Sequence, residues 1–378
     1  MKIKINPLSA GMFLAALVNI LGQPVITQQP TNQTPFNSMY SFGFSWTDTQ
    51  GLFRDGSPDF ANNNPRYWQN RTSNGQMWPE FLSVNLGLAY TATNNFARGA
   101  ATSSDTLAQV NNLPSRSNPE RGLYIVWVAA SDFFFAADPN SSSAINWTNE
   151  TAWNRLIQTA VKNSSNTVER LYAKGARSIV VQNCLDWSLA PGVLRDIGPN
   201  TNAFAALKER TARFNSDLVS ALQGSEQTKP DLRLFLVDIF SRENDVYASP
   251  ARYGFTTVTN DALDDPSLSD QSFTGPGKDY MFWDGLHGTS KLHELVAAWT
   301  LDVLTNSVLE QLEANHSGNA LNLKMNHLQI GRDYSLQSSA DLSHWQDVET
   351  FTAAAGTNLW PTALAGSSAS FYRLKWQP

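Results

Sequence analysis

The order of apolar and polar positions along the chain predicts strands that alternate with helices. Largely apolar runs, typical of strands buried in a parallel sheet, are SMYSFGF (38–44), LYIVWVAA (123–130), RSIVVQNC (177–184) and LRLFLVDIF (232–240). Helical periodicity extends over 153–176, 202–223 and 290–314. Strands that alternate with helices of this length predict an α/β fold, in which helices cover both faces of a parallel sheet.

The two ends of the chain differ from this central part. Lys2 and Lys4 precede an apolar run over 12–21, which predicts a secretory signal peptide in residues 1–22 and is too short to span a bilayer. A buried N-terminal helix is the alternative. Residues 23–36 are rich in Pro, Thr, Gln and Asn and are predicted to be a linker. After 315–319, short alternating runs predict a small all-β module over 320–378, so the main domain is expected to span 37–314.

Composition and charge narrow the class of protein. Of the 378 residues, 42% are hydrophobic and 16% are charged, which predicts a folded chain with a substantial core. The net charge of −6 provides no basic surface for nucleic acid. Cys184 is the only cysteine, so an internal disulfide is impossible, and no cluster of cysteines or histidines indicates a metal site. We expect no cofactor, no metal and no transmembrane segment.

Ser45 follows the first predicted strand, in the stretch YSFGFSWTDTQGLF (40–53). Ligands of parallel sheets bind beyond the carboxyl ends of the strands, so this serine is a candidate nucleophile, and a hydroxyl that caps a turn is the alternative. A serine nucleophile needs a base and an acid that orients the base. Asp284 and His287 lie three residues apart just before the last predicted helix, a spacing that can place a carboxylate beside an imidazole. The other histidines lie inside that helix, in the linker or in the small module, and are weaker candidates.

Six ordered blocks between Asn37 and Asn306 resemble the GDSL-type lipases and esterases of the SGNH hydrolase superfamily, a group that includes secreted bacterial lipases, phospholipases and plant GDSL lipases. The blocks are FGFSWTDTQG, NNFARGAATS, YIVWVAASDFFF, KGARSIVVQNCLDWSLAP, VYASPARYGFTTVTNDA and FWDGLHGTSKLH. The resemblance implies a flavodoxin-like, three-layer α/β/α domain, the SGNH hydrolase fold. It also implies that Ser45 is the nucleophile, Asp284 the acid and His287 the base of an ester hydrolase that needs no cofactor. The expected partner is a small-molecule ester or a lipid.

The resemblance further implies an oxyanion hole, in which this chain departs from the family. The family donors correspond to the amide of Ser45, an amide in the Gly99–Ala100 pair, which we assign to Ala100, and a side chain at Ser131, where the family has asparagine. Ala100 and Ala129 stand where the family has glycine, and alanine is strained if the local φ is positive. Serine reaches less far than asparagine, so the predicted oxyanion hole is altered.

Other residues of the same blocks are predicted to be structural. Phe44 replaces a family aspartate that does not belong to the triad. Asp48, the second aspartate of that block, is expected to hold the turn or to cap the next segment. Asp132 is expected to have a packing role or to form a loop hydrogen bond. Three tryptophans at predicted strand ends either line a substrate pocket or pack in the core: Trp127, Trp187 and Trp283.

Three functions are open as hypotheses. The first is a secreted serine esterase or lipase, and the second is a carbohydrate esterase that removes acetyl groups from polysaccharide. The third is a weakly active or inactive binding protein with this fold, suggested by the altered oxyanion positions. The C-terminal segment YSLQSSADLSHWQDV…FYRLKW is similar to small modules of secreted bacterial proteins, notably from verrucomicrobia, and indicates secretion or retention at the cell envelope. Its aromatic residues are predicted to fill its own core, with sugar binding as the alternative: Tyr334, Trp345, Tyr372 and Trp376.

Overall fold

The computed structural model describes residues 25–26, 36–198, 200–229, 231–308, 311–317, 320–326, 328, 333–339, 344–353, 357–363 and 371–376. One compact unit spans Pro35–Leu304, and a second contains the residues from Thr305 to the C-terminus together with those up to Thr34. The predicted signal peptide lies outside the described residues, as does most of the predicted linker. None of the helices in the described ranges is long and apolar enough to cross a membrane.

A parallel sheet of four strands forms the centre of the larger unit. The strands are β2 (Ser38–Phe42), β3 (Gly122–Trp127), β4 (Ser178–Gln182) and β5 (Arg233–Val237), in the spatial order β2-β3-β4-β5. Every residue of β3 and β4 is buried, as expected for apolar strands covered on both faces. Parallel pairing places Phe42, Val126 and Val181 side by side, so the carboxyl ends of these strands meet at one edge of the sheet.

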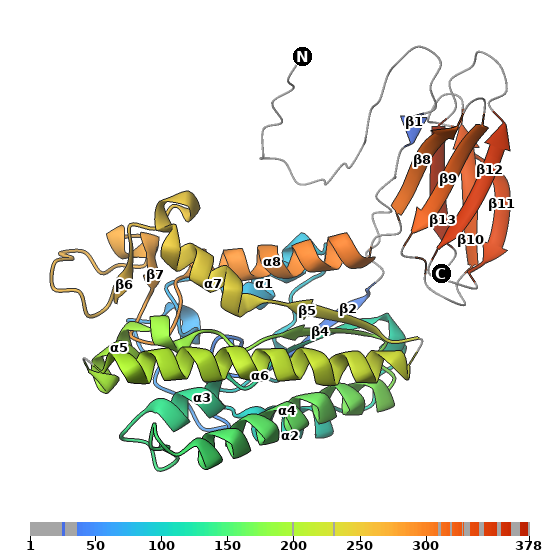
Figure 1. Cartoon of the computed structure of the whole chain (residues 1–378). Coiled ribbons are helices and arrows are strands. Elements are labelled where there is room, and N and C mark those ends of the chain that lie inside the picture. The colour runs from blue at the N-terminus through green and yellow to red at the C-terminus, as the bar shows by residue number, and fades with distance from the viewer. Residues whose placement is uncertain are drawn as a thin grey trace. The chain divides into compact units, whose positions relative to one another are not determined.

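Helices lie on both sides of this sheet, which confirms the predicted three-layer α/β/α architecture. In Figure 1, α1, α7 and α8 cover one face, and α2, α3, α4 and α6 cover the other. The α-helices are α1 (Trp78–Asn85), α2 (Ser103–Asn111), α3 (Ala130–Ala137), α4 (Glu150–Ala173), α5 (Pro191–Ile197), α6 (Thr201–Gln227), α7 (Ile239–Ala248) and α8 (Ser290–Val308). The 3₁₀ helices are η1 (Trp68–Asn70), η2 (Ala92–Asn94), η3 (Pro119–Arg121), η4 (Trp187–Leu189), η5 (Pro250–Tyr253) and η6 (Pro276–Asp279).

A short two-stranded sheet lies near the start of α8. It consists of β6 (Thr257–Asp261) and β7 (Tyr280–Phe282), which pair in parallel. The segment between β7 and α8 contains Asp284 and His287, and it is fixed at both ends. The Trp283 amide donates to the His287 carbonyl oxygen at 2.7 Å, and the Thr289 amide donates to the Met281 carbonyl oxygen at 3.0 Å.

The last predicted helix is shorter in the structure than the sequence pattern suggests. It ends at Val308, and Gln311–Ser317 forms strand β8 instead of a further helical turn. Strand β8 pairs antiparallel with β9 (Ala320–Asn326), with Gln311 opposite Asn326. Pairing with a partner strand therefore overrides the helical periodicity, and most of the segment that we predicted as the boundary, 315–319, belongs to a hairpin.

The second unit consists of two antiparallel sheets, with one parallel pair at an edge. Its remaining strands are β1 (Val25–Ile26), β10 (Asp333–Ser339), β11 (Gln346–Thr352), β12 (Asn358–Ala363) and β13 (Phe371–Trp376). The sheets have the orders β1-β13-β10-β11 and β12-β9-β8. Tyr334 is buried against Phe351, and Tyr372 packs beside Trp360 and Leu336. Tyr334 and Tyr372 thus contribute to the core of the module, as predicted.

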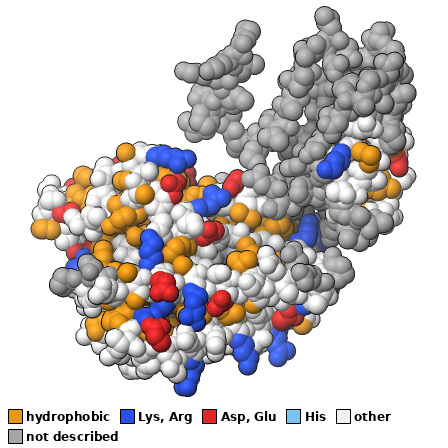
Figure 2. Space-filling view, in the orientation of Figure 1, with side chains coloured by type: hydrophobic (Ala, Val, Ile, Leu, Met, Phe, Trp, Pro, Cys, Tyr) orange, Lys and Arg blue, Asp and Glu red, His pale blue; other side chains and the backbone are white. Residues whose placement is uncertain are grey.

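Charged side chains are interspersed on the visible face of the larger unit. Figure 2 shows acidic and basic groups next to one another, without an extended basic area among the described residues on this face. Ion pairs among the described residues include Arg177 with Asp231 at 2.6 Å and Arg242 with Asp302 at 2.8 Å. Exposed pairs of this kind contribute little to stability.

Candidate active site

Ser45 lies in the turn by which the chain leaves the sheet after β2. Gly43 has a φ of 140°, which side chains rarely allow, and a Cβ there would lie 2.9 Å from the Trp127 carbonyl oxygen. The Gln109 side chain holds this glycine by two hydrogen bonds. It accepts from the Gly43 amide and donates to the Gly43 carbonyl oxygen, both at 2.9 Å. Ser45 is thus held just beyond the carboxyl end of β2, where ligands of parallel sheets bind.

The candidate triad residues lie in one hydrogen-bonded chain. His287 Nε2 is 2.9 Å from Ser45 Oγ. On the other side of the ring, His287 Nδ1 is 2.9 Å from both carboxylate oxygens of Asp284. Ser45 is 8% exposed and His287 is 4% exposed, so the serine–histidine contact is shielded from water. With Nδ1–H donated to the carboxylate, Nε2 is free to accept the serine proton.

The Asp284 carboxylate receives further hydrogen bonds that hold it in place. The amides of Leu286 and His287 donate to Oδ1, each at 2.8 Å, and the Tyr67 hydroxyl donates to Oδ2 at 2.8 Å. Burial by itself would raise the pKa of Asp284, but the charge of His287 and these donors outweigh burial and lower the pKa below its usual value. Asp284 is therefore kept ionised beside the imidazole.

The Tyr67 contact was not predicted, and it comes from a loop that packs beside the triad. The Phe60 ring lies 5.5 Å from the His287 ring and 5.3 Å from the Tyr67 ring, and Phe60 is 45% exposed. Trp283 Nε1 donates to the Arg66 carbonyl oxygen at 2.9 Å and so ties the loop to the segment before Asp284. Because Tyr67 and Asp284 are 217 positions apart, no local sequence signal links them.

Two alanines that stand where the family has glycine have the backbone conformation that glycine would favour. Ala100 and Ala129 have φ values of 61° and 62°, so both are in the left-handed region. Among the described residues, no acceptor is bonded to the amides of Ser45 or Ala100. The Gly99 amide, in contrast, donates to the Leu52 carbonyl oxygen at 2.6 Å and is not available as an oxyanion donor.

Ser131, the third predicted oxyanion donor, lies in the first turn of α3. It is 4% exposed, and Ala129 forms the N-cap of α3 without a side-chain hydrogen bond. The indole Nε1 of Trp187 donates to the Ala130 carbonyl oxygen at 2.7 Å and fixes this turn. The position predicted for the family asparagine is thus occupied by a buried hydroxyl at a helix N-terminus.

The sequence profile of the family described as GDSL-like Lipase/Acylhydrolase matches residues 39–300. The chain belongs to this family. A GDSL esterase/lipase of Arabidopsis thaliana, At5g22810, is 23% identical over 198 residues, which cover 50% of this chain and 53% of the relative. An acetylesterase of Thermothelomyces thermophilus is 23% identical over 326 residues, which cover 79% of this chain and 99% of the relative. The chain spans about half the length of the plant relatives that it matches.

A solved lipase structure, Lip_vut3 from a goat rumen metagenome, is similar over 71% of this chain and 97% of its own length. Its sequence identity is 12% and the TM-score is 0.41.

Two aspartates of the GDSL blocks support loops and do not contact the triad. Asp48 accepts from the Gln50 and Leu52 amides, both at 2.8 Å, and Asp132 accepts from the amide and the hydroxyl of Ser103 at 2.6 and 2.7 Å. Burial raises the pKa of Asp48 and the pKa of Asp132 to about 6 each. These structural roles agree with the sequence predictions. The three tryptophans that were candidates for a pocket are core residues, each at most 3% exposed: Trp127, Trp187 and Trp283.

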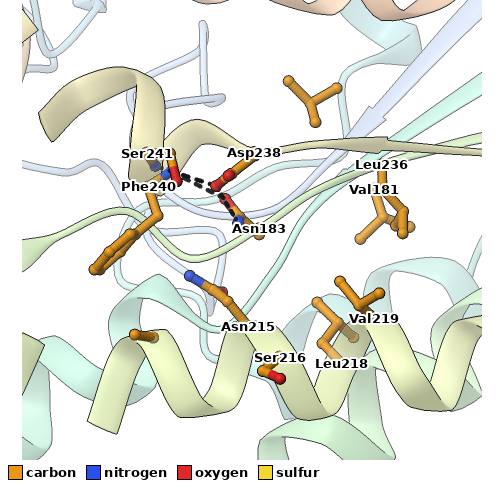
Figure 3. Close-up of a pocket in the computed structure, with 12 residues that line it drawn as sticks. Val181, Asn183, Asn215, Ser216, Leu218, Val219, Leu236, Asp238, Phe240 and Ser241 are labelled. Carbon is orange, nitrogen blue, oxygen red and sulfur yellow. Dashed lines mark hydrogen bonds between the residues drawn. The ribbon is translucent and has the colours of Figure 1, made fainter. Parts of the chain in front are cut away.

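A cavity of about 330 Å³ lies away from the triad, between α6, α7 and the ends of β4 and β5 (Figure 3). In its lining, Asn183 Nδ2 donates to Asp238 Oδ1 at 2.8 Å, and the backbone amide of Ser241 donates to the same oxygen at 3.1 Å. The other lining residues are mostly apolar, among them Leu236 and Val219. None of the candidate triad residues lines this cavity, so it is separate from the candidate active site. Within the described ranges, no group of three or more His, Cys, Asp or Glu residues could hold a metal ion.

Proposed function

We propose that this chain is a secreted serine hydrolase of carboxylic esters, with Ser45 as nucleophile, His287 as general base and Asp284 as the acid that orients it. The observation that carries the proposal is the continuous contact from Ser45 Oγ through the His287 ring to the Asp284 carboxylate. Membership of the GDSL-like lipase/acylhydrolase family supports the same reaction class. The charged and apolar pattern at the N-terminus supports secretion.

The reaction begins with transfer of the Ser45 proton to His287 Nε2. Ser45 Oγ attacks the ester carbonyl carbon, and the carbonyl electron pair moves to the oxygen, which becomes an oxyanion. When the tetrahedral intermediate collapses, the alcohol leaves with the proton from Nε2, and an acyl–Ser45 ester remains. Water then attacks this ester by the same steps, with Nε2 again as base and then as acid, and releases the carboxylic acid.

Charge on the oxyanion is stabilised by amide donors at Ser45 and Ala100, which have no acceptor of their own among the described residues. The Ser131 hydroxyl is the candidate third donor. Asp284 holds the ring in the tautomer with Nδ1 protonated and stabilises the imidazolium that forms in each step. These residues perform the proposed reaction without a metal or an organic cofactor.

A carbohydrate acetylesterase is the second candidate, and one observation favours it. The relative that the chain covers over 99% of its length is named an acetylesterase, whereas the plant lipase-type relatives are covered over about half. An acetyl ester of a polysaccharide would then be the substrate, in place of a lipid or a free small ester.

Hydrolysis of p-nitrophenyl acetate, butyrate, octanoate and palmitate by the full chain tests the proposal. We expect wild-type activity that disappears in Ser45→Ala and remains in Ser57→Ala, a control at an exposed serine. A fluorophosphonate should label Ser45, and labelling of another serine would contradict the assignment. Preference for acetate together with release of acetate from acetylated xylan selects the second candidate. Absence of activity on every ester would mean a binding protein that retains only the fold.

A further inference from the structure

Asp59 is a buried carboxylate beside the triad that has one oxygen without a donor. The side chain belongs to a residue that is 6% exposed, and its Oδ1 accepts from the Ala61 amide at 2.9 Å. Its Oδ2 is buried and has no hydrogen-bond partner among the described residues. A buried carboxylate oxygen without a donor costs stability, so the position is better explained by a role in the site than by packing.

Two glycines make room for this carboxylate. A Cβ on Gly99 would lie 3.1 Å from Asp59 Oδ2, and a Cβ on Gly51 would lie 3.3 Å from Asp59 Oδ1. The residue after Gly99 is Ala100, the proposed oxyanion donor. The residue after Asp59 is Phe60, whose ring lies 5.5 Å from the His287 ring. Asp59 Oδ2 therefore lies close to Gly99, and the ring of the residue that follows Asp59 lies against the ring of the base.

Other ionisable groups also act on these two residues. Asp284 and His293 interact electrostatically with His287, and Asp48 interacts with Asp59. Burial lowers the pKa of His293 to about 3, so this ring is neutral at neutral pH and adds no charge. Burial raises the pKa of Asp59, while the Ala61 amide, the charge of His287 and the Asn62 amide act in the opposite direction. Asp59 is thus a second carboxylate, besides Asp284, whose charge acts on His287.

We propose that Asp59 is an electrostatic positioning residue, whose ionised carboxylate stabilises the imidazolium form of His287 after Ser45 has given up its proton. The inference rests on the proposed hydrolase function. Asp284 contacts Nδ1 directly, and Asp59 adds its field from the side of the loop that carries Phe60. In a site shielded from water, such a field is screened little by solvent.

The first test measures the histidine directly and does not depend on ester hydrolysis. The titration of the His287 ring is followed by NMR with ¹⁵N-labelled histidine in the full chain with Ser45→Ala, and assigned with His287→Gln. Adding Asp59→Asn, which keeps the shape and an acceptor for the Ala61 amide, should move the titration midpoint to lower pH by about one unit. Adding Asp55→Asn, at an exposed position in the same loop, should leave it in place. An equal midpoint in the Asp59 and Asp55 variants would overturn the proposal.

The second test uses the active chain. Asp59→Asn should lower kcat/KM for p-nitrophenyl acetate on the alkaline plateau by about three- to tenfold, with KM unchanged, and should move the acid limb of the pH profile to lower pH. A loss of kcat without movement of the acid limb would mean a structural role only. If the wild type hydrolyses no ester, the proposed function fails, and the NMR titration still decides whether Asp59 acts on His287.

Discussion

Replacing Tyr67 by Phe removes one hydrogen bond from the Asp284 carboxylate and leaves the aromatic ring in place. The hydroxyl donates to Oδ2 at 2.8 Å, while two amides and the His287 ring also bind the carboxylate. The Asp284 side chain is only 14% exposed, so water replaces the lost donor poorly. A hydrogen bond to a charged group contributes about 1.5–3 kcal/mol. Because other donors remain, we expect the unfolding free energy of Tyr67→Phe to fall by about 1–2 kcal/mol at neutral pH.

The loss should depend on pH in a defined direction. Although burial raises the pKa of Asp284, the His287 charge and the hydrogen bonds lower the pKa below that of the unfolded chain. Such a group contributes stability that is fully present above its unfolded pKa and disappears as the pH falls through its folded pKa. Tyr67→Phe removes part of this contribution. The difference between wild type and variant should therefore be largest near pH 7 and shrink below about pH 4.

Urea unfolding of both proteins from neutral to acidic pH measures this difference. Tyr172→Phe is the matched control, because the Tyr172 hydroxyl donates at 2.7 Å to Asp231, whose carboxylate is exposed, and little change is expected there. The kcat of Tyr67→Phe on a short ester should also fall severalfold with KM unchanged, since the carboxylate orients the base only. Equal stability of Tyr67→Phe and wild type at every pH would refute the reasoning, because the bond would then contribute nothing in solution.

Three further predictions concern the oxyanion hole, a buried acid and the second unit. Ser131→Asn should raise kcat on a simple ester by about tenfold or more with little change in KM, because an amide donor reaches the oxyanion better than a hydroxyl. A fall in kcat with an intact circular dichroism spectrum would mean that the site has been rebuilt around serine. Burial raises the pKa of Asp132 to about 6, so ionisation of this carboxyl destabilises the folded chain as the pH rises. In urea unfolding, the free energy of unfolding of Asp132→Asn should therefore increase relative to wild type by up to about 2 kcal/mol between about pH 4 and pH 6. A chain that ends at Val308 should fold and hydrolyse small esters, whereas one that ends at Ser317 keeps β8 without its partner β9 and should aggregate in size-exclusion chromatography. Loss of folding in the shorter chain would show that the larger unit depends on the second.

The sequence predicted the larger unit well because its signals are local. Each central strand is a short apolar run, whose sequence predicts burial without knowledge of the neighbouring strands. Strand β3, Gly122–Trp127, is an example. The spacing of Asp284 and His287 made them candidates for a pair, and their hydrogen bond closes within one turn before α8. Ser45 became a candidate because ligands bind at the carboxyl ends of parallel strands. The assignment of all three as nucleophile, acid and base came from the resemblance of their sequence blocks to the GDSL family.

The contacts that sequence reasoning missed join segments that are far apart in the chain. Tyr67 reaches Asp284, and Trp283 reaches the Arg66 backbone, each across 217 positions. No periodicity or short motif reports such a pair. The end of the last helix was missed for a related reason, because the residues after Val308 gain a strand partner that helical periodicity does not include. Local patterns thus predicted the elements, and long-range packing determined where one of them ends and what surrounds the base.

Where this chain departs from the family, changes at backbone positions and the change at a side-chain donor have different consequences. Ala100 and Ala129 have a positive φ, at a cost of roughly 1–2 kcal/mol each relative to glycine. Hydrogen bonds to neighbouring segments hold the main chain at these two positions. The Gly99 amide donates to the Leu52 carbonyl oxygen at 2.6 Å, and the Trp187 indole donates to the Ala130 carbonyl oxygen at 2.7 Å. The substitution of glycine therefore affects stability and leaves the main-chain path in place. No backbone contact can replace a missing side-chain amide, so the difference in catalysis from the asparagine-containing members of the family is expected to arise chiefly at Ser131.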